Sequence, residues 1–310
     1  MTLKKMLRAG GRFLLDSDYR FLLLDEVGVY DRWDDTKYLK RKYKAYMKKT
    51  LNLEEPKTFN EKLQWLKIYD HNPAYTIMVD KNKAKKFVSD KLDSGERYII
   101  PTLGVWDSFD EIDFSMLPNQ FVLKCTHDSG NVVICKDKVK FDIKKAKKVL
   151  DKSLKNNFYL RGREWPYKNV PRKIIAEKYV VDNSTSELRD YKFYCFDGKV
   201  KLLMIASNRF SKKQTCFDYF DRDFNHVDLV WGNPNSRVLL EKPQTFEKMV
   251  EIAEKLSEGI PHVRVDLYEC NGRDYFGELT FFDGSGFGAF EDPSWDEKMG
   301  EWLTLPEKMG

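Results

Sequence analysis

Residues 262–286, HVRVDLYECNGRDYFGELTFFDGSG, decide the fold of this chain. Asn271-Gly272 separates two runs of alternating polar and apolar residues, which is the pattern of a β-hairpin. A two-residue turn puts the apolar positions of the first strand on the same face as the carboxylates of the second. A three-residue turn, Cys270–Gly272 with a bulge at Gly272, separates the two kinds of side chain. We therefore predict the three-residue turn, in which Glu269 pairs with Arg273.

This register predicts a polar face that carries two carboxylates. Arg264 lies opposite Glu278, and Asp266 lies diagonal to Glu278, with backbone positions roughly 7–8 Å apart. Two carboxylates at that separation can hold one or two magnesium ions with nucleotide phosphates between them. The alternative is a surface sheet with a cross-strand Arg–Glu pair. The Gly-rich loop 281–286 favours a site, because its N–H groups could bind an anionic substrate.

Three cations upstream of the hairpin are candidates for phosphate contacts. Lys124 ends an apolar strand and precedes a Ser129-Gly130 turn, although many ordinary hairpins look the same. No P-loop motif is present, so the phosphate cradle is not of the Walker type. Lys192 lies within a predicted strand and Arg209 follows the next one. Each of these two points either to solvent or into a cleft.

Periodicity and turn signals predict helices first and two β/α units afterwards. Thr58 and Glu61 form a capping box at the start of one helix. The basic helix 36–49 is interpreted as a solvated helix with Tyr38, Leu39 and Tyr46 packed inward, in preference to a docking surface for an anionic polymer or membrane. We expect helices over 36–49, 58–72, 79–92, 143–154 and 246–256, and strands over 98–101, 121–124, 132–135, 174–181, 190–196, 199–206, 262–269 and 273–281.

Composition excludes several classes of protein. The 310 residues carry 42% hydrophobic side chains and a net charge of +5, which suits a globular protein that binds anions but not a dedicated nucleic-acid binder. The five cysteines form no C-x-x-C pair, so a zinc site or a disulfide framework is not expected, and a reducing cytoplasm fits best. The apolar run 21–24 is too short for a signal sequence or a membrane span, which limits membrane contact to a peripheral one.

Several segments occur in a fixed order: Asp80-Lys81, KCTHDSG at 124–130, IIAEKY at 174–179, RDYKF at 189–193, RVDLYE at 264–269 and GELTFFDGSGF at 277–287. Together they resemble the ATP-grasp amidoligase family, the group similar to the teichuronopeptide-biosynthesis ATP-grasp protein. The resemblance runs from about Asp31 to Pro306 and includes PKTFNEKLQWLKIYD at 56–70 and GREWPYKN at 162–169. It implies an α+β ATP-grasp fold in which two α/β lobes, residues 101–178 and 179–310, clamp a nucleotide after a mostly helical region, residues 1–100.

The resemblance also implies roles for individual residues. Those that would bind ATP are Lys81, Lys85, Lys124, Ser129 and Gly130 at the phosphates, Glu177, Lys178, Tyr179 and Val180 at the adenine, and Glu187 at the ribose. Lys192, Arg264 and Arg209 would be the catalytic cations. Asp266 and Glu278 would bind Mg²⁺ together with Thr280, which stands where family members commonly carry Asn. The loop residues Asp283, Gly284, Ser285 and Gly286 would contact the substrate.

The implied reaction is attack of a carboxylate on the γ-phosphate of ATP, followed by displacement of phosphate from the acyl phosphate by an amine. Family context suggests a small-molecule or glycan carboxylate such as a uronic acid, and an amino acid or amino sugar as the amine, in bacterial surface-polysaccharide synthesis. A glycosyltransferase that uses a nucleotide sugar is an alternative, which the absence of a D-x-D triplet near the end of a predicted strand disfavours. A kinase and a non-catalytic nucleotide-binding module are further alternatives.

Overall fold

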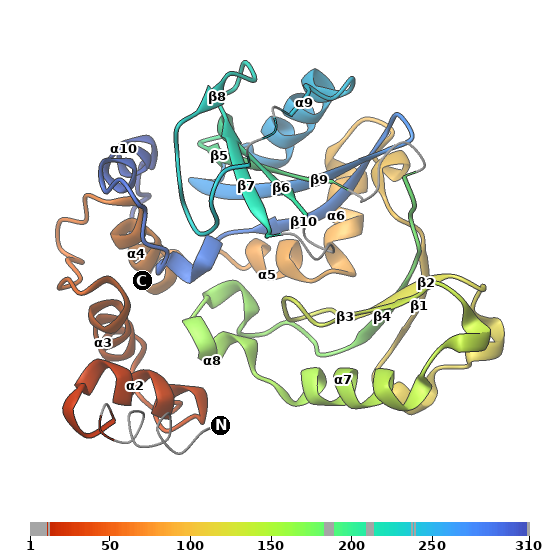
Figure 1. Cartoon of the computed structure of the whole chain (residues 1–310), viewed down its shortest axis with the longest axis horizontal. Coiled ribbons are helices and arrows are strands. Elements are labelled where there is room, and N and C mark those ends of the chain that lie inside the picture. The colour runs from red at the N-terminus through yellow and green to blue at the C-terminus, as the bar shows by residue number, and fades with distance from the viewer. Residues whose placement is uncertain are drawn as a thin grey trace.

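The computed structural model describes residue 11 and residues 13–182, 189–208, 214–236, 238 and 240–308. This part of the chain folds into two antiparallel sheets with helices around them (Figure 1). The helices are α2 (Ser17–Glu26), α3 (Asp35–Met47), α4 (Phe59–Tyr69), α5 (Ala74–Val79), α6 (Lys83–Lys91), α7 (Ile143–Lys155), α8 (Phe158–Gly162), α9 (Phe246–Ser257) and α10 (Ser294–Trp302), with 3₁₀ turns η1 (Gly95–Tyr98), η5 (Trp165–Tyr167) and η6 (Asp283–Gly286) among the connections. None of the described helices is both long and apolar enough to cross a membrane.

The smaller sheet has four strands in the order β1-β4-β2-β3: β1 (Thr102–Trp106), β2 (Phe121–Cys125), β3 (Val132–Cys135) and β4 (Ile174–Lys178). Its buried face packs Phe121, Leu123 and Ala176 in a cluster of their own, which includes Ala146 and Leu150 of α7. The opposite face carries Lys124 and Glu177, since side chains alternate along a strand. The small sheet thus has one apolar face and one charged face.

The larger sheet has six strands in the order β10-β9-β5-β6-β7-β8: β5 (Asp190–Phe196), β6 (Lys199–Ser207), β7 (Cys216–Phe220), β8 (His226–Val227), β9 (His262–Cys270) and β10 (Arg273–Thr280). Helix α9 covers one face with Phe246, Met249 and Val250, all fully buried. The expected helices 143–154 and 246–256 and the hairpin 190–206 are confirmed.

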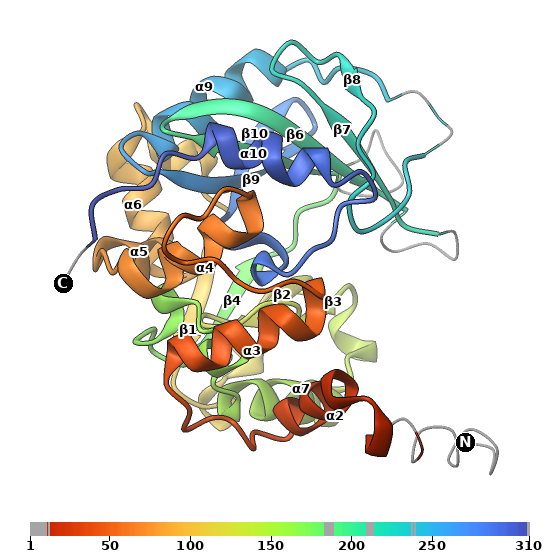
Figure 2. The same ribbon diagram turned by 90° about the vertical axis from the view of Figure 1, so that its left-hand side faces the viewer.

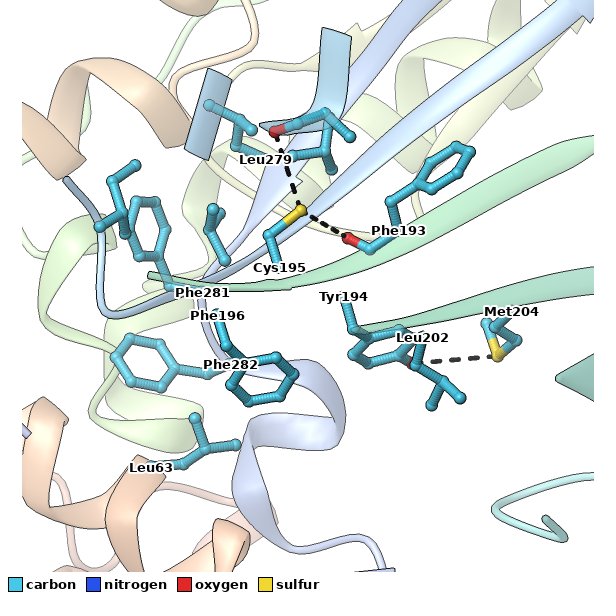
Figure 3. Packing of buried hydrophobic residues seen from close by; sticks show 14 of the residues in the cluster. Leu63, Phe193, Tyr194, Cys195, Phe196, Leu202, Met204, Leu279, Phe281 and Phe282 are labelled. Atoms are coloured by element: carbon cyan, nitrogen blue, oxygen red, sulfur yellow. Dashed lines mark hydrogen bonds between the residues drawn. The ribbon is translucent and has the colours of Figure 1, made fainter. Parts of the chain in front are cut away.

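The N-terminal helices have no separate core. Their buried side chains belong to the same cluster as those of the larger sheet. Figure 3 shows Leu63 of α4 beside Phe282, close to Phe196 of β5. Figure 2 shows α10 in front of the larger sheet, α3 in front of the smaller sheet and α4 between them. The predicted capping box of Thr58 and Glu61 is confirmed at the start of α4.

The predicted turn of the decisive hairpin is wrong. Arg273 pairs with Cys270 across a two-residue turn, in which Asn271 and Gly272 have positive φ angles of 52° and 73°. This is the backbone that an Asn-Gly hairpin turn needs. The bulge lies instead at Gly277, where the register shifts between Phe276 and Glu278. The bulge restores the separation of apolar and polar faces that the alternation required.

Three other expectations differ from the structure. Residues 98–101 are not a strand, because η1 ends at Tyr98 and β1 begins at Thr102. The helix expected over 79–92 is interrupted after Val79, and α6 begins at Lys83. Tyr46 is 49% exposed, whereas Tyr38, Leu39 and Tyr43 are the buried side chains of α3.

His262 provides a test of the packing of the larger sheet. Its Nδ1 lies 2.9 Å from the carbonyl oxygen of Cys195, and the rings of Phe59 and Phe196 enclose it. Burial lowers the pKa of His262 to about 4. Between about pH 6.5 and 4 the unfolded chain therefore binds a proton that the folded chain does not. The free energy of unfolding decreases as the pH is lowered through this window.

We expect wild type to lose about 3 kcal/mol more free energy of unfolding between pH 7 and 4 than His262→Gln, which has no titrating ring. Urea unfolding at several pH values measures this difference. Parallel stability curves for the two proteins would contradict the assignment.

Candidate functional site

A row of three charged side chains crosses the larger sheet on the face opposite α9. Lys192 of β5 pairs in register with Asp266 of β9, which in turn pairs with Glu278 of β10. The next row is Tyr194, Arg264 and Thr280. The predicted pairing of Arg264 with Glu278 is wrong because of the bulge at Gly277. Asp266 lies directly opposite Glu278, closer than the predicted diagonal.

Asp266 is almost completely buried and is held by two cations. Its Oδ1 accepts from Nε of Arg264 at 2.7 Å, and its Oδ2 accepts from the second guanidinium nitrogen of Arg264 at 2.8 Å and from Lys192. Lys192 also lies 2.6 Å from Asp190. Burial alone would raise the pKa of Asp266, but Arg264 and Lys192 outweigh it and hold the pKa below its usual value.

Arg264 connects this row to the loop after β10. Its guanidinium forms an ion pair with Asp283, donates to Thr280 Oγ1 at 3.2 Å and lies 3.7 Å from Glu278. The hydroxyl of Tyr194 donates to the other oxygen of Asp283. Asp283, expected at the substrate, therefore also fixes the direction of Arg264.

The donor set fits a magnesium ion that completes its shell with phosphates. A carboxylate has about four lone-pair positions, and protein donors use three of those on Asp266, so a position remains for a metal. Glu278 is 35% exposed beside it. Within the described residues, no three His, Cys, Asp or Glu side chains gather as a metal cluster. The chain thus supplies two carboxylates, and Mg²⁺ commonly binds through one or two carboxylates plus substrate phosphates.

The charged face of the smaller sheet carries a second buried cluster. Glu177 of β4 accepts from Lys85 of α6 at 2.6 Å and from Lys124 of β2 at 2.6 Å. Burial would raise the pKa of Glu177, but the two lysines reverse this and hold it below its usual value. The structure therefore brings three of the predicted nucleotide residues together. It also gives Glu177 a side-chain role that the prediction of backbone contacts to adenine did not include.

Other predicted residues lie around these two clusters. The Lys81 ammonium donates to the Asp128 carbonyl, and burial lowers the pKa of Lys81. Ser129 and Gly130 follow in the same loop, and Gly130 has a φ angle of 89°. Lys178 ends β4, and Tyr179 and Val180 begin the connection from the smaller to the larger sheet.

Two predicted residues, Glu187 and Arg209, lie outside the described residues. The loop residues Gly284, Ser285 and Gly286 have φ angles of 53°, 55° and 63°. The N–H of Gly284 donates to Asp283 Oδ1, and the N–H of Ser285 donates to the Phe282 carbonyl. These two N–H groups, expected to bind an anionic substrate, are thus engaged inside the loop.

A cavity of about 380 Å³ opens beside the Asp266 row. Arg264, Glu278 and Thr280 line one side of it, and the segment 158–167 lines another. Ser129 of the smaller lobe and Ser285 of the loop also reach it. The cavity therefore joins the predicted metal ligands to the predicted substrate loop.

The sequence interpretation missed several polar residues at this cavity: Arg161, Glu164 and Tyr167. They lie in or next to the GREWPYKN segment, which carried the resemblance but received no role. Asp190 was missed too, although its position two residues before Lys192 places it on the same face of β5. The alternation of side chains along β5 would have identified Asp190. Nothing in the sequence indicated that segment 158–167 lies close to the hairpin of β9 and β10.

Comparison with known proteins places these features in a family. The family model described as TupA-like ATPgrasp matches residues 61–304. No curated protein sequence matches the chain. Among solved structures, the chain is similar to D-alanine–D-alanine ligase from Bacillus anthracis complexed with ATP, at a TM-score of 0.39 and 15% identity, covering 66% of this chain and 54% of that one.

Two further structures are similar at the same low level. They are D-alanine–D-alanine ligase from Helicobacter pylori, with a TM-score of 0.40, 16% identity and coverage of 79% and 69%, and the ATP-grasp ligase PsnB complexed with minimal precursor, Mg and ADP, with a TM-score of 0.38, 10% identity and coverage of 84% and 68%. The chain spans little more than half the length of the Bacillus anthracis ligase.

The buried Lys85–Glu177–Lys124 cluster predicts a large effect of neutralisation. Glu177→Gln leaves two partly buried ammonium groups without their counter-charge and should cost about 3 kcal/mol of unfolding free energy. Glu247 is a matched control, because it also bridges two cations, Lys242 at 2.7 Å and Arg222 at 3.1 Å, but is 59% exposed. Glu247→Gln should cost much less than Glu177→Gln, because solvent screens exposed ion pairs. Urea unfolding of both variants measures the two losses of unfolding free energy. Equal losses would contradict the larger contribution expected from the buried cluster.

Proposed function

This chain belongs to the TupA-like ATP-grasp family, and we propose that it is an ATP- and magnesium-dependent ligase that joins a carboxylate to an amine through an acyl phosphate. The observation that carries this proposal is the row of Lys192, Asp266 and Glu278, with Arg264 beside it, at the edge of a cavity that both lobes line. This arrangement offers carboxylates to a metal and cations to a phosphoryl group within one site.

Each cluster has a distinct task in the proposed reaction. Lys81, Lys85 and Lys124 bind the nucleotide phosphates from the side of the smaller sheet, as point charges rather than as a P-loop. Asp266 and Glu278 hold Mg²⁺, which when bound neutralises charge on the phosphates and orients them. Lys192 and Arg264 stabilise the negative charge of the transferred phosphoryl group and of the acyl phosphate. Catalysis by these residues is thus positioning and electrostatic stabilisation.

The substrates are proposed from the resemblance and from the chemistry of the cavity. We assign the carboxylate to a uronic acid or another sugar or amino-acid carboxylate, and the amine to an amino acid or amino sugar, in the synthesis of a bacterial surface polysaccharide or capsule. All five cysteines are free, which supports the cytoplasmic location proposed for this step. The modest net charge of +5 supports small-molecule or glycan partners over nucleic acid.

Thermal unfolding with a nucleotide panel tests the proposal directly. ATP with Mg²⁺ should raise the melting temperature of wild type, because a ligand that binds only the folded state stabilises it by mass action. Asp266→Asn and Glu278→Gln should each lose most of the magnesium-dependent part of this shift. ADP release in a screen of carboxylates against amines, with product mass measured, then identifies the reaction.

The structure places a D-x-D triplet, Asp221-Arg222-Asp223, directly after β7, so the inference from its absence is wrong. The exposed Asp223 of this triplet provides the control for the loss of one carboxylate. Asp223→Asn should keep the full shift with ATP and Mg²⁺. Stabilisation by a UDP-sugar and not by ATP would overturn the ligase proposal in favour of a glycosyltransferase. ADP formation with a phosphorylated acid or sugar as the only product would identify a kinase.

A further inference from the structure

Glu164 is a buried carboxylate on the cavity wall that faces the metal hairpin. It follows α8 directly, is 7% exposed and lines the cavity with Gly162 and Tyr167. Across the cavity lie Arg264 and Glu278, where the acyl phosphate of the proposed reaction would form. A buried carboxylate requires hydrogen bonds and usually a cation. The environment of Glu164 therefore indicates what the cavity binds.

The protein gives Glu164 a hydrogen bond and a nearby cation, Lys67, whose charge lowers the Glu164 pKa against the larger effect of burial. The hydroxyl of Ser285 donates to its carboxylate. Among the described residues, no ion pair involves Glu164. Gly162 allows this close approach, since a Cβ at that position would lie 2.2 Å from Ser285 Oγ and 3.1 Å from Glu164 Oε1.

Lys67 is the nearest candidate for a counter-ion, but its three donors are already used. Its Nζ lies 3.0 Å from Gln64 Oε1, 2.7 Å from the Ser285 carbonyl and 3.0 Å from Ser285 Oγ. An ammonium group has three N–H bonds and no more. Burial lowers the pKa of Lys67 to about 7, and the charge of Glu164 acts against this shift. Lys67 thus holds Ser285 in place and leaves the Glu164 carboxylate open to the cavity.

We propose that Glu164 binds the ammonium group of the amine substrate and accepts its proton, which makes the cavity a site for a primary amine of the size of one amino acid or one amino sugar. This inference rests on the proposed ligase function. The cavity volume of about 380 Å³ lies at the small end of ligand pockets, which run from about 300 to 1,000 Å³. The rings of Phe158 and Tyr167, 4.7 Å apart on the same wall, offer an apolar surface to the body of the amine.

The proton has a defined path in this step. An amine is protonated at neutral pH and has no lone pair for attack, so one proton passes from the ammonium to the Glu164 carboxylate. The nitrogen lone pair then forms a C–N bond with the carbonyl carbon, and the bond from that carbon to the phosphate oxygen breaks. The second N–H proton leaves with the phosphate. Burial raises the pKa of Glu164, which makes its carboxylate a stronger base than an exposed one.

A purely structural role for Glu164 predicts different results. If the residue served only to pack segment 158–167, an isosteric Glu164→Gln would change stability but not the discrimination between charged and neutral ligands. The charge of the probe, rather than its shape, therefore distinguishes the two roles. N-acetylation removes the charge and adds an acetyl group, and the comparison of wild type with Glu164→Gln separates the effect of charge from that of size.

The experiment measures binding by thermal shift and calorimetry with AMP-PNP and Mg²⁺ present throughout. The probes are glycine, L-lysine and D-glucosamine, each with its fully N-acetylated form. We expect at least one amine to bind wild type, its acetylated form to bind at least about tenfold more weakly, and Glu164→Gln to lose that preference. Glu164→Asp, which keeps the charge, should retain the preference at lower affinity.

Each outcome has one meaning. Equal binding of amines and acetylated forms, no binding of any amine, or an unchanged preference in Glu164→Gln overturns the assignment of Glu164. An undiminished shift with AMP-PNP and Mg²⁺ in Glu164→Gln shows that the variant is folded and that the nucleotide site is intact. If AMP-PNP and Mg²⁺ do not stabilise wild type, the ligase proposal itself has failed, and this result is separate from the amine measurements.

Discussion

The buried Asp266 carboxylate is the constraint on which the site depends. An ion with 1% exposure is tolerated only when it is paired and hydrogen bonded, so Lys192 and Arg264 must reach it from the same face of the sheet. This requirement fixes the register of three strands. Arg264 then binds Asp283, which positions the loop η6, and η6 is in turn held by Lys67 from α4. A single ionic cluster thereby connects the β9–β10 hairpin, the loop that follows β10 and helix α4.

The cavity wall 158–167 depends on a part of the chain that lies before the family match, which begins at residue 61. The Arg161 carbonyl accepts from Lys42, whose ammonium also binds Asp25 at 2.8 Å. The buried guanidinium of Arg163 donates to two carbonyls of the α2–α3 connection and lies 4.4 Å from the ring of Tyr38. Arg163 has a φ angle of 53°, which an L-residue adopts only when its surroundings hold it there. Helices α2 and α3 and their connection therefore shape the proposed amine site.

The sequence predicted the hairpin of β9 and β10 and most of the helices and strands, but only part of the candidate site. Alternation identified the faces of β9 and of Glu278–Thr280 correctly, because burial of Val265 and Leu279 on one side is a local property of the chain. It placed Asp274, Tyr275 and Phe276 on the wrong faces, because the bulge lies at Gly277 and not at Gly272, and alternation alone does not locate a bulge. No role could be assigned to Glu164 from the sequence, because its partners lie more than 100 residues away in the chain. Its carboxylate accepts from Ser285, and Glu278 lines the same cavity.

The two charged clusters differ in the sign of their net charge, and this asymmetry would orient a bound nucleotide. In the cluster beside the smaller sheet, counting only Lys81, Lys85 and Lys124 against Glu177, two positive charges remain. In the cluster on the larger sheet, counting only Asp190, Asp266, Glu278 and Asp283 against Lys192 and Arg264, two negative charges remain. The clusters are close, since Glu278 acts on the pKa of Lys81. Phosphates are favoured on the first side and a divalent cation on the second. A magnesium–nucleotide pair matches this polarity, whereas either ion alone would satisfy only one cluster.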